Sequence, residues 1–199
     1  MCVFGDSLVE GFGDSIGLGW VGRVAARTPS TADVQLTTYP LGVQGESTEE
    51  IVVRIPLESA ARFARGDDHR IVISSGVNDA NRGIPPARSA AALDFGLGST
   101  DVPVLVVGPP PLGDAALTAR IAMVDEAFAG VCDRQGVPYI STYDRLLRRP
   151  TWRRGTSDDG IHPDKEGYAM LARIVLDGGW LPWLGLPAPE RSGGKSRAK

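Results

Sequence analysis

The sequence has few of the features that mark several common protein classes. It holds 2 cysteines in 199 residues, too few for the disulfide framework of a small secreted domain. Because Cys2 and Cys132 both lie in apolar surroundings, we interpret them as buried free thiols. No apolar run approaches the ~20 residues that a membrane helix needs, so we expect no stable membrane anchor. Basic residues are not in excess: 21 Lys and Arg against 24 Asp and Glu give a net charge of −3, which argues against a nucleic-acid surface.

The two ends of the chain are also informative. A strand-like run begins at residue 2 and leaves no room for the charged and apolar regions of a secretory signal. We therefore expect a cytoplasmic protein. The length suits one domain with a full hydrophobic core, which we place at residues 1–187. Residues 188–199 are polar, basic and contain Gly and Ser, a composition that predicts a disordered tail.

Short apolar runs alternate with helical patterns along the chain. The predicted strands are residues 2–4, 34–39, 70–75, 102–107 and 137–141, and the predicted helices are residues 20–27, 49–65, 86–97, 115–134 and 164–176. Pro56 should kink or split the second helix. Such alternation predicts an α/β fold, a three-layer sandwich in which a five-stranded parallel sheet carries helices on both faces. Ligands of these sheets bind beyond the carboxyl ends of the strands.

A serine follows the first strand directly, in the motif Gly5-Asp6-Ser7-Leu8. Gly5 permits a tight turn, and backbone N–H groups point outward from the first turn of whatever follows. The motif is nearly repeated in Phe12-Gly13-Asp14-Ser15-Ile16, but only the first copy follows a strand. We therefore select Ser7 as the candidate nucleophile and interpret the second copy as a flexible loop before Trp20.

A histidine and a carboxylate lie close together near the other end, in Asp159-Gly160-Ile161-His162-Pro163. The Asp159 carboxylate can accept the Nδ1 proton of His162, which leaves Nε2 to take a proton from a serine hydroxyl. Asp158 is the alternative partner. The second histidine, His69, lies in a polar turn that we expect to be solvated. A nucleophile, a base and an orienting carboxylate are the parts of acyl-transfer chemistry.

Two further loops at strand ends offer hydrogen-bond donors. Gly42 and Gly45 lie after the predicted second strand, and Asn78 follows the third in Gly76-Val77-Asn78-Asp79. A glycine lets a backbone N–H approach a ligand closely, and the Asn78 side chain can donate from its amide. With the Ser7 N–H, these groups would form three donors around a developing oxyanion.

The ordered set of Gly5-Asp6-Ser7-Leu8, Gly45, Gly76-Val77-Asn78-Asp79 and Asp159-Gly160-Ile161-His162-Pro163 resembles the SGNH hydrolase superfamily, the GDSL esterases and lipases. The resemblance covers residues 5 to about 175. It implies a flavodoxin-like sheet and ester hydrolysis through an acyl-enzyme, without metal or nucleotide. It also implies that Ser7 is the nucleophile, that Asp159 and His162 form its dyad, and that Ser7, Gly45 and Asn78 make the oxyanion hole.

The second block departs from the family pattern, in which Asn commonly begins the block and Asp follows the glycine. Here Tyr39-Pro40-Leu41 occupies the Asn region and Glu46 replaces the Asp. The choice between Gly42 and Gly45 as donor therefore depends on spacing, which favours Gly45.

The sequence predicts a small-molecule ester as substrate and leaves its identity open. An esterase for short to medium acyl chains, a carbohydrate O-deacetylase, and an acyltransferase or thioesterase would share this machinery. Residues 107–112, with three consecutive prolines, follow the fourth strand and are interpreted as a stiff wall of the site. Arginines cluster before the His162 loop, at Arg145, Arg148, Arg149, Arg153 and Arg154. They would either attract an anionic substrate or form a solvated face.

Overall fold

A computed structural model describes residues 1–31, 35–152, 155–157, 159 and 161–187. Its centre is a sheet of five parallel strands in the order β2-β1-β3-β4-β5. The strands are β1 Cys2–Gly5, β2 Tyr39–Gly42, β3 Ile71–Ser74, β4 Val104–Val107 and β5 Tyr139–Ile140. This is the strand order of flavodoxin-like folds, so the predicted α/β class and topology are confirmed.

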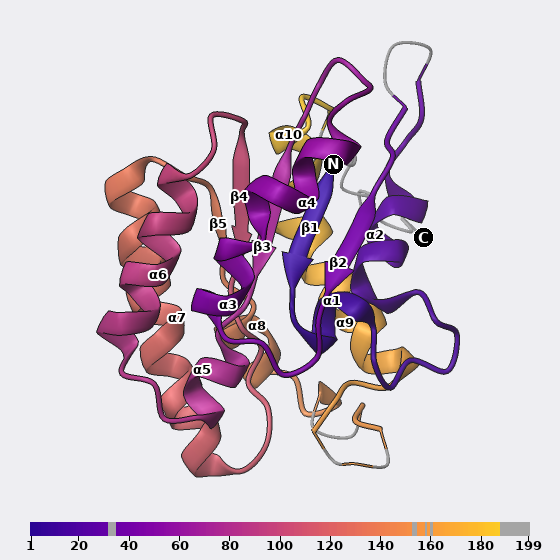
Figure 1. Cartoon of the computed structure of the whole chain (residues 1–199). Coiled ribbons are helices and arrows are strands. Elements are labelled where there is room, and N and C mark those ends of the chain that lie inside the picture. The colour runs from indigo at the N-terminus through magenta and orange to yellow at the C-terminus, as the bar shows by residue number, and fades with distance from the viewer. Residues whose placement is uncertain (32–34, 153–154, 158, 160, 188–199) are drawn as a thin grey trace, which may run out of the picture.

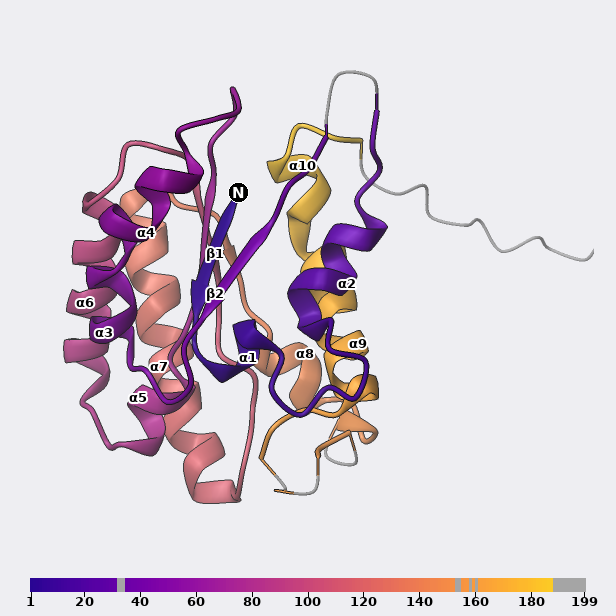
Figure 2. The ribbon, with the colours of Figure 1, turned by 45° about the vertical axis from the view of Figure 1, so that its right-hand side comes forward.

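Helices cover both faces of this sheet and make three layers (Figures 1 and 2). One face carries α3 Thr48–Val53, α4 Ile55–Arg62, α5 Val77–Asn81, α6 Pro86–Gly98 and α7 Ala115–Gln135. The other carries α1 Ser7–Glu10, α2 Gly19–Arg27, α8 Tyr143–Leu147, α9 Lys165–Val175, the π-helical turn η2 Leu176–Trp180 and α10 Leu181–Trp183. Figure 2 shows the two layers on opposite sides of the strands.

The core explains why the strands read as apolar runs. Every residue of β1, β3 and β4 is buried, as expected for parallel strands covered on both faces. The apolar stripe of α7 is buried against the sheet from Leu117 to Val131. Trp180 is also buried, and its indole N–H donates to the Thr28 hydroxyl at 2.9 Å. Cys2 and Cys132 are buried and free, as predicted.

The second strand was predicted in the wrong place. The expected strand at residues 34–39 shares only Tyr39 with the observed β2, and Val34 lies outside the described residues. Residues 39–42 read poorly as a strand because they include Pro40. However, β2 is an edge strand, and within the described residues it pairs with β1 alone; proline is tolerated at a sheet edge.

The other boundaries follow the sequence closely. The helix expected at residues 49–65 is split in two at Arg54, and Pro56 stands in the first turn of the second part, α4, a favourable position for proline. Asp114 and Asp164 cap the N-termini of α7 and α9 with their side chains. In the described part of the chain, no helix combines the length and apolar character needed to cross a membrane. The predicted tail, 188–199, lies outside the described residues.

Candidate active site

The first strand ends in a turn that presents Ser7. Gly5 is the last residue of β1, Asp6 caps α1, and Ser7 is the first residue of that helix. A Cβ at Gly5 would lie 2.3 Å from the Val9 side chain and 2.4 Å from the Ser74 carbonyl oxygen. Only glycine therefore allows the helix to fold back so tightly on the sheet.

Ser7 meets His162 across 155 residues of sequence. The Ser7 Oγ lies 2.9 Å from the His162 Nε2, and the His162 Nδ1 lies 2.5 Å from the Asp159 Oδ2. Ser7 is 7% exposed. The structure thus brings together the three side chains that the sequence selected, in the serine–imidazole–carboxylate order of nucleophilic acyl-transfer sites.

The Asp159 carboxylate is held by its own loop. Its Oδ1 accepts from the backbone N–H groups of Ile161 and His162, each at 2.9 Å, and from the Ser157 hydroxyl at 2.8 Å. Partial burial raises the pKa of Asp159, but the hydrogen bonds from His162, Ile161 and Ser157 outweigh it and hold that pKa well below the usual value. The carboxylate therefore stays charged beside the imidazole. The alternative partner, Asp158, lies outside the described residues.

The imidazole is supported on its other sides as well. The Phe12 ring meets the His162 ring edge-on, with centroids 4.7 Å apart, and the Tyr168 hydroxyl donates to the Phe12 carbonyl at 2.8 Å. The His162 carbonyl accepts from the Ser157 N–H at 2.7 Å.

The other histidine, His69, was expected to be solvated. It is instead half-buried and stacks on Phe63.

The second Gly-Asp-Ser copy forms a loop, as predicted, but the loop is tightly held. The Asp14 carboxylate accepts from the N–H groups of Ile16, Leu18 and Gly19 and pairs with the Arg23 guanidinium. The hydrogen bond and charge of Arg23 lower the pKa of Asp14 to about 2 despite partial burial. No hydrogen bond among the described residues joins Ser15 to His162. The second copy is a structural turn.

Asn78 lies in the first turn of α5 and Gly45 in the loop after β2, and hydrogen bonds of Asn78 join that loop to Asp6, the residue before Ser7. The Asn78 Nδ2 donates to the Asp6 Oδ2 and to the Glu46 carbonyl, each at 3.1 Å. Gly45 precedes Glu46 and has a φ of +79°, a conformation that favours glycine. Gly42, the other candidate donor, lies in β2, where a Cβ would fall 2.3 Å from the Glu10 nitrogen. Its lack of a side chain is therefore explained by packing against α1.

Two arginines that the sequence analysis did not select fix this loop. Arg54 pairs with Glu46 at 2.7 Å and also donates to the Leu41 carbonyl at 3.2 Å. Arg82 donates to the Gly45 carbonyl. The departure from the family pattern at Glu46 thus coincides with an ion pair that holds the loop. No motif in the sequence marks this pair, in which Glu46 precedes α3 and Arg54 follows it.

Asp79 has a structural task. It is buried, and its Oδ2 accepts from the Thr48 N–H at 2.9 Å and the Thr48 hydroxyl at 3.0 Å. This contact joins the start of α3 to α5. It thereby fixes the loop that carries Gly45 and the helix that carries Asn78 relative to each other.

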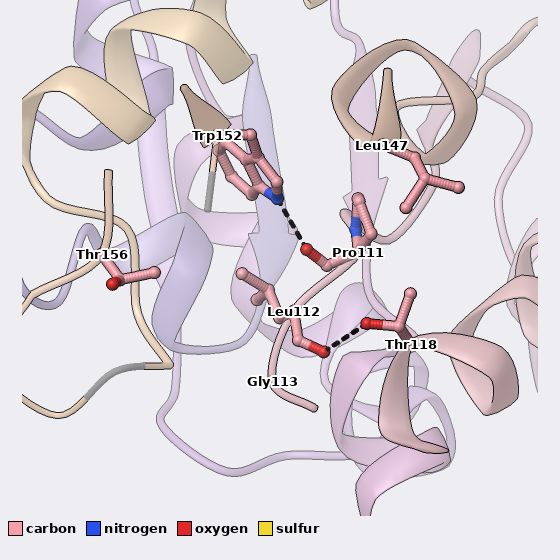
Figure 3. Close-up of a pocket in the computed structure, with 7 residues that line it drawn as sticks. All are labelled: Pro111, Leu112, Gly113, Thr118, Leu147, Trp152 and Thr156. Carbon is pink, nitrogen blue, oxygen red and sulfur yellow. Dashed lines mark hydrogen bonds between the residues drawn. The ribbon is translucent and has the colours of Figure 1, made fainter. Parts of the chain in front are cut away.

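A cavity of about 220 Å³ lies beside the His162 loop (Figure 3). Its lining comprises Pro111, Leu112, Gly113, Thr118, Leu147, Trp152 and Thr156. Thr156 forms a backbone bridge with Pro163, which follows His162. Figure 3 shows the Trp152 indole donating to the Pro111 carbonyl, at 2.6 Å. Of the predicted wall at residues 107–112, Pro111 and Leu112 line this cavity, whose lining includes none of the catalytic side chains.

The arginine cluster is only partly described. Arg145, Arg148 and Arg149 are exposed, and Arg148 lies 3.9 Å from Asp144, whereas Arg153 and Arg154 fall outside the described residues. The three described arginines form a solvated face.

Among the residues that the structure describes, no group of three or more His, Cys, Asp or Glu side chains is placed to hold a metal ion.

Comparison with known proteins agrees with this fold. Among solved structures, the chain is similar to a lipase/acylhydrolase from Enterococcus faecalis, with a TM-score of 0.74 and 22% identity over 95% of this chain and 97% of that one. It is also similar to a member of the lipolytic G-D-S-L family from Veillonella parvula, with a TM-score of 0.72 and 24% identity over 88% and 95%. A third similar structure is a carbohydrate acetylesterase from Sinorhizobium meliloti, with a TM-score of 0.65 and 19% identity over 88% and 95%.

No curated protein matches the sequence. The family description does match: residues 3–170 fit the GDSL-like Lipase/Acylhydrolase family, and this range includes every residue of the site. The chain therefore belongs to the GDSL-like lipase/acylhydrolase family and is an ester hydrolase.

Proposed function

We propose that this protein is a serine hydrolase that cleaves carboxylic esters of short to medium acyl chains through an acyl-enzyme on Ser7. The observation that carries the proposal is the 2.9 Å separation of the Ser7 Oγ and the His162 Nε2. This distance allows the imidazole to take the hydroxyl proton as the oxygen attacks an ester carbonyl.

The remaining groups have complementary tasks in this mechanism. Asp159 holds His162 with Nε2 toward the serine and stabilises the imidazolium that forms. The oxyanion accepts from the Ser7 N–H at the start of α1, from the Gly45 N–H and from the Asn78 Nδ2. His162 then gives its proton to the leaving alcohol, and a water molecule repeats the sequence to release the acid and restore Ser7.

The small volume of the cavity favours substrates with small acyl groups. At about 220 Å³, it is below the roughly 300 to 1,000 Å³ that is usual for pockets of drug-sized ligands. Exposed apolar side chains flank the site, Phe12 against the His162 ring and Ile161 next to it in sequence. The catalytic side chains do not line the cavity, but it adjoins their loop through the Thr156–Pro163 bridge. We therefore infer that a short acyl chain would occupy the cavity and that a somewhat longer one would extend along this apolar rim.

The test uses the two near-identical motifs as variant and control. Ser7→Ala should abolish hydrolysis of p-nitrophenyl acetate and labelling by a fluorophosphonate probe, whereas Ser15→Ala should retain both. Equal activity of the two variants would refute the assignment. A series of p-nitrophenyl esters from acetate to decanoate should show kcat/KM highest at the short end, and a maximum at decanoate would contradict the proposed acyl preference.

A carbohydrate O-deacetylase is the second candidate. The small cavity suits an acetyl group, and the similar structure from Sinorhizobium meliloti is described as a carbohydrate acetylesterase. Acetyl release from acetyl-xylan, compared with p-nitrophenyl acetate at equal ester concentration, distinguishes the two. Rapid release from the sugar would favour the deacetylase, and its absence would favour the simple esterase.

A further inference from the structure

Asp6 is a buried carboxylate to which the mechanism above gives no task. It is 2% exposed. Its Oδ1 accepts from the Leu8 N–H at 2.9 Å, and its Oδ2 accepts from the Asn78 Nδ2 at 3.1 Å. Burying a carboxylate is costly, and here burial raises the pKa of Asp6 to about 6. Its hydrogen bonds go to the helix that begins with Ser7 and to the proposed oxyanion donor.

The Asn78 amide has no hydrogen to spare. An amide nitrogen carries two hydrogens, and the Asn78 Nδ2 already has two acceptors, the Asp6 Oδ2 and the Glu46 carbonyl. For Asn78 to donate to an oxyanion, one of these bonds must be exchanged. A hydrogen bond to an ionised carboxylate is stronger than one to a neutral carbonyl. The hydrogen bond to the Glu46 carbonyl is therefore the one that is broken.

We propose that Asp6 is a positioning residue for the oxyanion hole. Its carboxylate keeps one N–H of Asn78 throughout the reaction, and the other N–H moves from the Glu46 carbonyl to the developing oxyanion. Because Arg54 holds the Glu46 side chain at 2.7 Å, the loop stays in place and only the amide bond is exchanged. This inference rests on the proposed function, in which Asn78 is an oxyanion donor.

Two variants of Asp6 separate this role from helix capping. Asp6→Asn keeps an oxygen for the Leu8 N–H but turns an amide donor toward Asn78, so the amide can no longer be held. Asp6→Ser also retains a capping oxygen, and its side chain is too short to reach Asn78. Both are measured with p-nitrophenyl acetate beside Asn78→Ala and the double variant Asp6→Asn/Asn78→Ala, with circular dichroism to show that each is folded.

The expected result is a loss in kcat of about 10-fold or more for either Asp6 variant, with KM changed less than about 3-fold, since only a transition-state contact is lost. Asn78→Ala should lose about 10²-fold. The double variant should be no slower than Asn78→Ala, because a residue that acts only through Asn78 has nothing left to position.

The outcomes distinguish the inference from the proposed function. If the two losses multiply in the double variant, or if kcat is unchanged in the Asp6 variants, the inference is wrong while the role of Asn78 stands. If Asn78→Ala has wild-type kcat, the oxyanion assignment itself fails. The control is Asp125→Asn, which alters a carboxylate that accepts from Tyr139 at 2.5 Å and Ser141 at 2.9 Å. Its kcat should be unchanged in the folded protein.

Discussion

Replacing the buried Asp6 by Asn should change how stability depends on pH. Burial raises the pKa of Asp6 to about 6 from the usual 3.8, and the nearby Asp79 charge adds to this, while the Leu8 N–H and the His162 charge oppose it. Between these two values the folded state binds more protons than the unfolded state. Asp6 therefore lowers the stability of the wild-type protein as pH rises from about 4 to 6.

The magnitude follows from the size of the pKa change. A rise from 3.8 to about 6 corresponds to about 3 kcal/mol in full, at about 1.4 kcal/mol for each pH unit. About 2 kcal/mol of this develops between pH 4 and pH 7. Asn does not titrate, so the variant does not undergo this decrease in the free energy of unfolding. Relative to the wild type, Asp6→Asn should be more stable by about 2 kcal/mol at pH 7 than it is at pH 4.

Urea unfolding of both proteins at pH 4, 5.5 and 7 measures this difference. The titration of all other groups is shared and cancels in the comparison. Asp14→Asn, measured against the wild type between pH 2 and pH 4, is the control with the opposite sign: Arg23 lowers the pKa of Asp14 to about 2, so that variant should lose relative stability as pH rises over this range. A difference between Asp6→Asn and the wild type that stays constant from pH 4 to pH 7 would refute the reasoning.

Three further predictions concern the site and the core. Asp159→Asn should lower kcat by about 10³-fold, because the imidazole loses its orienting charge, and should hardly change the free energy of unfolding. A pH–rate profile should show slow hydrolysis at every pH, and a near-wild-type kcat would contradict the assigned role. Gly42→Ala should lower the free energy of unfolding measured in urea by about 3 kcal/mol, because the added Cβ would lie 2.3 Å from the Glu10 nitrogen. An unchanged urea midpoint would show that α1 moves freely. Phe128→Ala, at a fully buried position, should cost about 4 kcal/mol and lower Tm by roughly 10 °C, with kcat unchanged at 25 °C; loss of kcat in the folded variant would show that the core and the site are coupled.

The sequence predicted much of the fold because local patterns carry the information. Buried parallel strands appear as continuous apolar runs, and the stripe along α7 appears at helical spacing. The position of the edge strand β2 was not predicted because the strand is short, partly exposed and contains Pro40. Neither alternation nor an apolar run marks it in the sequence. Its position follows from pairing with β1, a tertiary contact without a local signal.

The same division holds for the site. Ser7, Asp159 and His162 could be selected from the sequence because each lies in a short motif at the end of a strand or before a helix, and chemistry restricts which residue types serve as nucleophile, base and orienting group. What the tertiary structure decided is how these motifs meet: the 2.9 Å contact between Ser7 and His162, the arginines that hold the Gly45 loop, and the hydrogen bond from Asn78 to Asp6. Apart from the Arg54–Glu46 ion pair, each joins segments far apart along the chain, and such distances are set only when the sheet and its helices pack into one core.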